Sequence, residues 1–153
     1  MKNLFVPLFA YLLQRRGEIT GIAFIDSTSL EVCHNKRIKR NRVFKGLAQR
    51  GKTTSGWFYG CKLHLIINEK GEILAFHLTS GNVADVSVAE TLSKGIFGKL
   101  FGDRGYISAD LAKTLSKQGL ELFTTLRVNR KQRLMKLADK ILLRRRAITK
   151  DGK

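Results

Sequence analysis

The sequence predicts a single mixed α/β domain, in which helices pack on a mixed β-sheet. Two observations support this fold class. Three apolar or β-branched runs come first in the chain, and strand-like and helix-like segments then alternate. The length is also that of one domain: the chain has 153 residues, and 43% of them are hydrophobic, which is enough to bury a core.

The first half of the chain is predicted to hold a helix, three strands and a basic arm. They occupy residues 3–16 (helix), 21–27, 56–67 and 72–79 (strands) and 35–52 (arm, a long loop or irregular segment). Gly17 ends the helix. The last two strands form a hairpin, because the polar residues 68–71 between them are typical of a turn.

The second half is predicted to alternate helices and strands. These elements occupy residues 85–92 (helix), 98–101 (strand), 108–118 (helix), 122–126 (strand) and 131–146 (basic helix). Asp85 and Ser108 are candidate helix caps, and Gly119 is a helix stop. We expect Asp85 to act as a cap or as the partner of a basic side chain rather than as a metal ligand.

Two aspartates are the candidate catalytic residues. Asp26 follows the apolar run of the first strand, and Asp103 follows a later strand and lies between Gly102 and Gly105. A carboxylate at the end of a buried strand needs a partner, and paired aspartates with Mg²⁺ form the core of two-metal phosphoryl transfer. The alternative is that Asp26 is a cap and Asp103 belongs to a turn, paired with Arg104.

The charge of the chain predicts a polyanionic partner. Lys and Arg number 29 against 12 Asp and Glu, a net charge of +17. The longest apolar run, residues 4–13, is about half of the roughly 20 residues that a membrane span needs, so a membrane-spanning protein is excluded. Residues 36–52 contain no acid, which favours contact with DNA phosphates over a merely solvated face.

The candidate DNA-binding residues are the cations of this arm and two polar residues of the strand that follows it. They are Lys36, Arg37, Lys39, Arg40, Arg42, Lys45, Lys62 and His64. Lys62 and His64 share one face of a strand, which either lines the active site and the DNA or is a solvated sheet edge. The aromatic residues Trp57, Phe58 and Tyr59 are expected in the sheet core rather than in base stacking.

The two cysteines do not predict a metal site or a disulfide framework. Cys33 beside His34, and Cys61 three residues before His64, offer zinc ligands, but Cys61 and His64 are expected on opposite faces of their strand. Two cysteines in a chain of this length indicate a reducing cytosol.

Four motifs in register resemble a family. They are residues 25–28 (IDST), 60–65 (GCKLHL), 79–85 (TSGNVAD) and 102–107 (GDRGYI). Together they resemble a DDE-type insertion-sequence transposase, closest to the insertion-sequence nine-eighty-two family. The resemblance covers roughly residues 21–148.

The resemblance implies a ribonuclease-H-like catalytic domain over 21–148, after a remnant of an N-terminal helical region (1–20) and before a divergent tail (149–153). Asp26 and Asp103 would be catalytic acids and ligands of Mg²⁺ or Mn²⁺. The activity would be cleavage and strand transfer at the ends of a mobile DNA element, with element ends and target DNA as partners. It also implies a cytoplasmic, nucleoid-associated bacterial protein and is compatible with a homo-oligomer.

The C-terminal segment departs from the family pattern. Arg146 matches the arginine of the last catalytic helix, which puts Lys150 where the resemblance implies the catalytic glutamate. We therefore expect an inactive copy, incomplete at the C-terminus and truncated at both ends. The alternatives are a non-enzymatic basic nucleic-acid-binding protein, and a solo ribonuclease-H-like nuclease that takes its additional acid from Glu31 or Asp85.

Overall fold

The computed structural model describes residues 7, 10–12, 14–42, 44–53, 56–124, 138 and 141–142. Half of the predicted helix 3–16 and nearly all of the predicted basic helix 131–146 lie outside this part. The elements in chain order are β1 (Ile22–Cys33), η1 (Asn35–Arg40), β2 (Gln49–Thr53), β3 (Gly56–Asn68), β4 (Ile73–Ser80), α2 (Asp85–Leu92), β5 (Gly98–Gly102), η2 (Arg104–Tyr106), α3 (Ala109–Lys117) and β6 (Leu120–Thr124).

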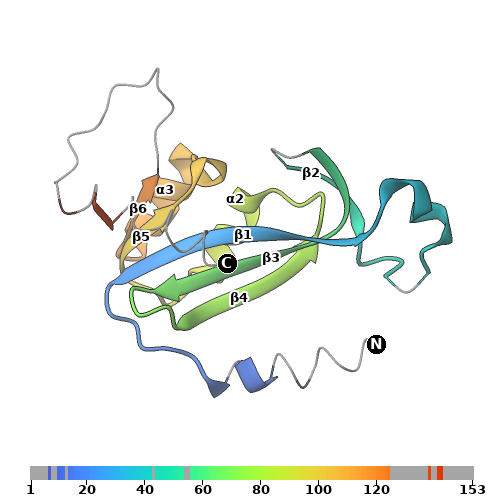
Figure 1. Ribbon diagram of the computed structural model, residues 1–153. Coiled ribbons are helices and arrows are strands. Elements are labelled where there is room, and N and C mark those ends of the chain that lie inside the picture. Colours follow the sequence, from blue (N-terminus) through green and yellow to red (C-terminus); the bar gives the residue numbers. More distant parts are fainter. Residues whose placement is uncertain are drawn as a thin grey trace.

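The strands form one mixed sheet of six strands. β1 pairs with β3 antiparallel on one side and with β5 parallel on the other, and β6 extends the sheet parallel to β5. β2 and β4 share the outer edge of β3: β2 pairs with its first five residues and β4 with residues 61–67. The predicted mixed α/β sheet with flanking helices is confirmed (Figure 1).

The hydrophobic core joins the sheet to α2 and α3. Ile25 of β1, Ile66 of β3 and Leu100 of β5 are at most 1% exposed and belong to one cluster with Leu92 and Leu115 of the helices. An aromatic row also crosses the sheet: the ring of Phe101 lies 5.6 Å from that of Phe24 and 5.1 Å from that of Phe123. Because side chains alternate along a strand, Phe24 lies on the face opposite Ile25.

β1 and β2 differ most from the prediction, and β6 begins at Leu120 rather than at residue 122. β1 continues to Cys33 rather than ending at residue 27, because its polar second half keeps pairing with β3 through Glu31 and Cys33. β2 was expected to be part of the irregular arm. It is polar, so its sequence gives no strand signal, and it forms by pairing as an edge strand. A Cβ at Gly51 of β2 would lie 2.2 Å from the Gly81 carbonyl oxygen, so the close approach of β2 to the end of β4 requires glycine.

The helix caps are partly as predicted. Ser108 caps α3, since its side chain accepts a hydrogen bond from the Leu111 amide at 3.2 Å, and Gly119 follows α3 with a φ of +78°. Asp85, in contrast, is not the cap of α2. Ala84 occupies the N-cap position without a side-chain bond, and Asp85 lies in the first turn. There its carboxylate is free to reach β3.

Candidate active site

Asp26 and Asp103 each lie two residues beyond the last residue pair between the adjacent strands β1 and β5. β1 and β5 are adjacent parallel strands in which Phe24 pairs with Phe101, and the two aspartates each follow two residues later. The backbone at Asp103 is still extended, with φ −86° and ψ −178°, so both carboxylates share the face of the aromatic row. Adjacent strands are about 4.8 Å apart. Asp103 directly follows its strand, whereas Asp26 lies within β1 and not at its end as expected.

A tight turn holds Asp103 in place. Its carboxylate accepts a hydrogen bond from the Gly105 amide at 2.5 Å and caps the short helix η2. A Cβ at Gly105 would lie 3.3 Å from Oδ1 of Asp103 and 3.1 Å from Oδ2 of Asp85. Gly105 therefore leaves room for the carboxylates of Asp103 and Asp85. Asp85, at the start of α2, is the third acid at this end of the sheet beside Asp26 and Asp103.

Asp85 is neutralised by a lysine of the central strand. Lys62 Nζ lies 3.1 Å from Asp85 Oδ1 and also donates to the Val83 carbonyl at 3.0 Å. The two side chains are only 13% and 22% exposed. The predicted role of Asp85 as the partner of a basic side chain is thus confirmed. Lys62 is neither at a solvated edge nor open to the surface.

His64 lies beneath this ion pair and is 1% exposed. Its Nε2 is 2.9 Å from Thr79 Oγ1, and its Nδ1 is 4.0 Å from Asp85 Oδ1. Burial lowers the pKa of His64, and the positive charge of Lys62 acts in the same direction, against the opposing carboxylate of Asp85. The imidazole is consequently held neutral at physiological pH.

Tyr106 lies close to all three acids. It is 1% exposed and belongs to the core cluster. Burial raises its pKa strongly, and the carboxylates of Asp85, Asp26 and Asp103 raise it further because they repel a phenolate. Its hydroxyl lacks a hydrogen bond of good geometry, although Ser27 is close enough to lower that pKa in part. A neutral phenol therefore lies within electrostatic reach of all three acids.

The donor set suits a hard cation. Asp26 and Asp103 offer carboxylate oxygens on one face of the sheet, and Mg²⁺ takes one or two carboxylates while keeping several waters. No group of three histidine, cysteine or acidic side chains that could hold a metal occurs among the described residues. Cys61 and His64 contact different partners, since the Cys61 thiol lies 3.8 Å from the Leu47 carbonyl. Glu31, on the face opposite Asp26 and five residues further along β1, is exposed.

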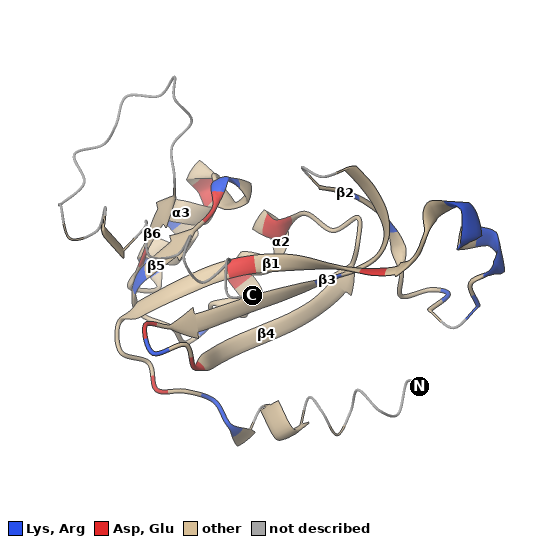
Figure 2. Cartoon of the chain, viewed as in Figure 1, with Lys and Arg blue, Asp and Glu red and all other residues tan. Residues whose placement is uncertain are grey.

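The cations of the arm are concentrated at the end of the sheet away from β5 and β6, as Figure 2 shows. The exposed members are Lys36, Arg37, Lys39, Arg40, Arg42 and Lys45. Trp57 adjoins them and is 61% exposed, so the expectation that it lies in the sheet core is wrong. Strand alternation explains this, because its neighbour Phe58 points into the interior and is 6% exposed.

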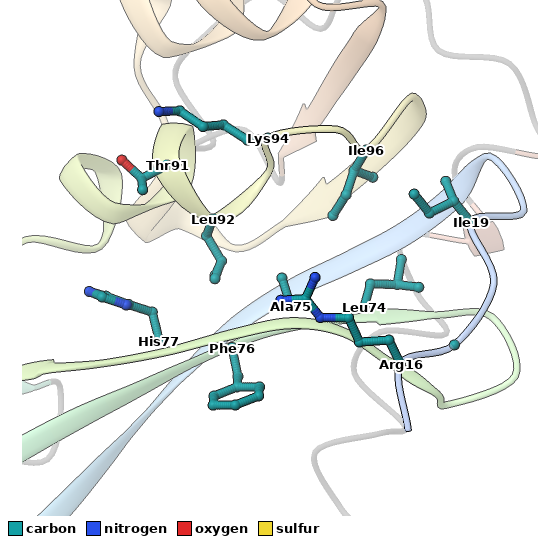
Figure 3. Close-up of a pocket in the computed structure, with 11 residues that line it drawn as sticks. Arg16, Ile19, Leu74, Ala75, Phe76, His77, Thr91, Leu92, Lys94 and Ile96 are labelled. Atoms are coloured by element: carbon teal, nitrogen blue, oxygen red, sulfur yellow. The ribbon is translucent and has the colours of Figure 1, made fainter. Parts of the chain in front are cut away.

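A pocket of about 380 Å³ lies between β4 and the C-terminal end of α2. Leu92 and Ile96 form one wall and Leu74 and Ala75 the other (Figure 3). Neither candidate catalytic aspartate lines it. The acids and the pocket are separate features. Within the described segments, no helix has the length and apolar character needed to cross a membrane.

Comparison with known families identifies the chain. Residues 16–151 match the family described as the transposase DDE domain. The chain belongs to this DDE transposase family. A structure of the piggyBac transposase synaptic complex with hairpin DNA has a similar fold, with a TM-score of 0.51 and 18% identity. That similarity covers 81% of this chain and 27% of the piggyBac chain, so this DDE transposase domain spans about a quarter of that protein. No curated protein sequence matches the chain.

Proposed function

We propose that the chain is the catalytic domain of a DNA transposase of the insertion-sequence nine-eighty-two family, with Asp26 and Asp103 as catalytic acids. The observation that carries this proposal is their equivalent register on adjacent parallel strands in a chain of the DDE family. A bound Mg²⁺ or Mn²⁺ would supply charge stabilisation and an activated oxygen nucleophile for phosphodiester cleavage. Asp26 and Asp103 would hold it.

Residues around the two aspartates position their carboxylates and limit the charge of the site. The short bond from the Gly105 amide fixes the orientation of the Asp103 carboxylate. Lys62 compensates the charge of Asp85, which limits the repulsion that three acids would otherwise exert on one another. The neutral Tyr106 side chain is buried in the core cluster beside them and adds no charge to the site.

The exposed arm would hold the DNA backbone. Its cations face solvent, where they can neutralise phosphates without regard to sequence. Neutralising six phosphates gives a slope of about −5 for log affinity against log salt. Arg40→Glu with Arg42→Glu should weaken duplex binding and flatten this slope, whereas an unchanged affinity would contradict a role for the arm.

The chemical test is metal-dependent cleavage of DNA that carries the ends of the parent element. We expect at most weak residual nicking in Mg²⁺ or Mn²⁺, which should be lost in Asp26→Asn and in Asp103→Asn and retained in Asp110→Asn, an exposed acid at the start of α3. Concerted strand transfer should be absent, because Lys150 occupies the position that the family resemblance assigns to a glutamate. Efficient strand transfer would refute that part of the proposal.

The second candidate is a non-enzymatic basic DNA-binding protein, which the net charge of +17 favours. It predicts DNA binding that survives both chelation and the double substitution of Asp26 and Asp103, with no cleavage in either metal. The nuclease alternative would require Asp85 as an additional acid, and its pairing with Lys62 weighs against that role.

A further inference from the structure

We propose that Trp57, Arg50 and Asn35 form a binding site for one unpaired nucleotide of single-stranded DNA, at the base of the basic arm. The inference rests on the proposed DNA-binding function and goes beyond it, because it names a base-stacking site distinct from the catalytic acids. The three residues line a cavity of about 310 Å³, close to the lower limit of the volumes typical of small-molecule sites.

The strand register sets the geometry of this site. Lys52 pairs directly with Trp57, and Arg50 lies two residues before Lys52 on β2, so all three share one face. The Lys52 ammonium lies 5.6 Å from the centre of the indole ring. An exposed aromatic ring flanked by two mobile cations is the arrangement that stacks a base and holds its phosphate.

Asn35 supplies a polar group to the lining of the cavity. Its Nδ2 donates to the Trp57 carbonyl at 3.0 Å, which ties the start of η1 to β3. This bond orients the amide, and its buried Oδ1 then accepts no hydrogen bond among the described residues. A buried acceptor without a partner is costly. An exocyclic amino group of adenine, cytosine or guanine would satisfy it.

A duplex cannot use this site as it stands. In a duplex the ring faces are stacked on the neighbouring base pairs, so only an unpaired or extruded base offers its ring face to Trp57 together with its amino group to Asn35. The exposed η1 cations beside the site suit the flanking phosphates. The resulting preference is for single strands, added to the sequence-independent attraction of the arm.

The chain offers a specific probe, because Trp57 is its one tryptophan. Intrinsic fluorescence is measured while a mixed-sequence single strand, the corresponding duplex or RNA of the same sequence is added, and the anisotropy of labelled DNA reports binding separately. We expect the single-stranded DNA to quench Trp57 over the concentration range in which anisotropy saturates. Quenching should weaken in Asn35→Ala and for oligothymidine, which has no exocyclic amino group.

Substitution provides the second readout. Trp57→Ala should weaken single-strand binding about 5- to 100-fold, the loss of one stacked base, and change duplex binding less than about threefold. Phe97→Ala is the matched control, since Phe97 is 55% exposed and lies outside this site, and it should change neither.

The outcomes separate the two proposals. Two results would overturn the nucleotide site and leave the DNA-binding function standing. One is binding measured by anisotropy without quenching of Trp57. The other is an equal loss of affinity for single strand and duplex in Trp57→Ala. A stronger response to RNA would assign the site to RNA and overturn the DNA assignment. Absence of any binding to DNA would refute the proposed function and the site together.

Discussion

Removing the carboxylate of Asp85 tests how much the ion pair under α2 contributes to stability. Asp85→Ala deletes a charge-assisted bond to a lysine that is 13% exposed and leaves that lysine with the Val83 carbonyl alone. Hydrogen bonds to charged groups contribute about 1.5–3 kcal/mol, and an acid in the first helical turn about 0.3–1 kcal/mol. We expect the free energy of unfolding to fall by about 2–4 kcal/mol.

Asp110→Ala is the matched control for this change. Asp110 occupies the first turn of α3 as Asp85 does in α2, but it is exposed. It should lose only the helix-dipole contribution, about 0.3–1 kcal/mol. Urea titrations followed by circular dichroism give both values, with thermal midpoints shifting about 2–4 °C per kcal/mol for a domain of this size.

A double-mutant cycle isolates the pair itself. Lys62→Met leaves Asp85 without its cation, so it should also destabilise, whereas the double variant Lys62→Met/Asp85→Ala should cost less than the sum of the two. The expected coupling energy lies in the range of about 0.5–3 kcal/mol found for residues in contact. Additivity within about 0.5 kcal/mol, or a loss in Asp85→Ala no larger than in Asp110→Ala, would refute the reasoning.

Three further outcomes follow from buried groups. The lowered pKa of His64 means that the unfolded chain binds its proton more tightly, so stability should fall as pH decreases below about 6.5, and His64→Gln should reduce this dependence. Tyr106 should keep its proton at the pH at which free tyrosine ionises. Tyr106→Phe should therefore leave the 295 nm absorbance titration through about pH 10 unchanged. A smaller titration amplitude in this variant would contradict the raised pKa of Tyr106. Gly60→Ala should lower the free energy of unfolding by about 1–3 kcal/mol, because its Cβ would lie 1.9 Å from the Leu30 carbonyl oxygen. The measurement is the urea midpoint, and an unchanged midpoint would show that β1 and β3 can separate there.

Much of the sheet could be predicted from local sequence. β3 and α2 carry strong signals, aromatic and β-branched residues in one and apolar residues at helical spacing in the other, and both were expected within one residue of their observed bounds. β2 could not be predicted, because its residues are polar and its pairing depends on a distant glycine, Gly81. Pairing between segments far apart in sequence leaves little local trace.

The candidate site likewise has residues that local sequence predicts and residues whose placement depends on tertiary packing. Its two aspartates could be found because each follows an apolar run, and the structure brings them to equivalent positions. The proximity of Asp85 and Tyr106 to them could not, since it depends on how α2 and η2 pack against the sheet. For Trp57 the alternation of side chains along β3 was the available signal: assigning Phe58 to the core requires its neighbour to point outward.

The length of β1 sets the distance between the proposed catalytic acids and the proposed DNA-binding arm. From Asp26 the strand continues for seven residues to Cys33, where the basic arm begins. At about 3.3 Å per residue this is about 23 Å, the rise of about seven base pairs of B-form DNA. A duplex that lay along β1 would thus place the cleaved bond and the arm about two-thirds of a helical turn apart. Shortening or lengthening β1 and β3 by matched pairs of residues would move the contacted phosphates along the footprint and leave the acids where they are.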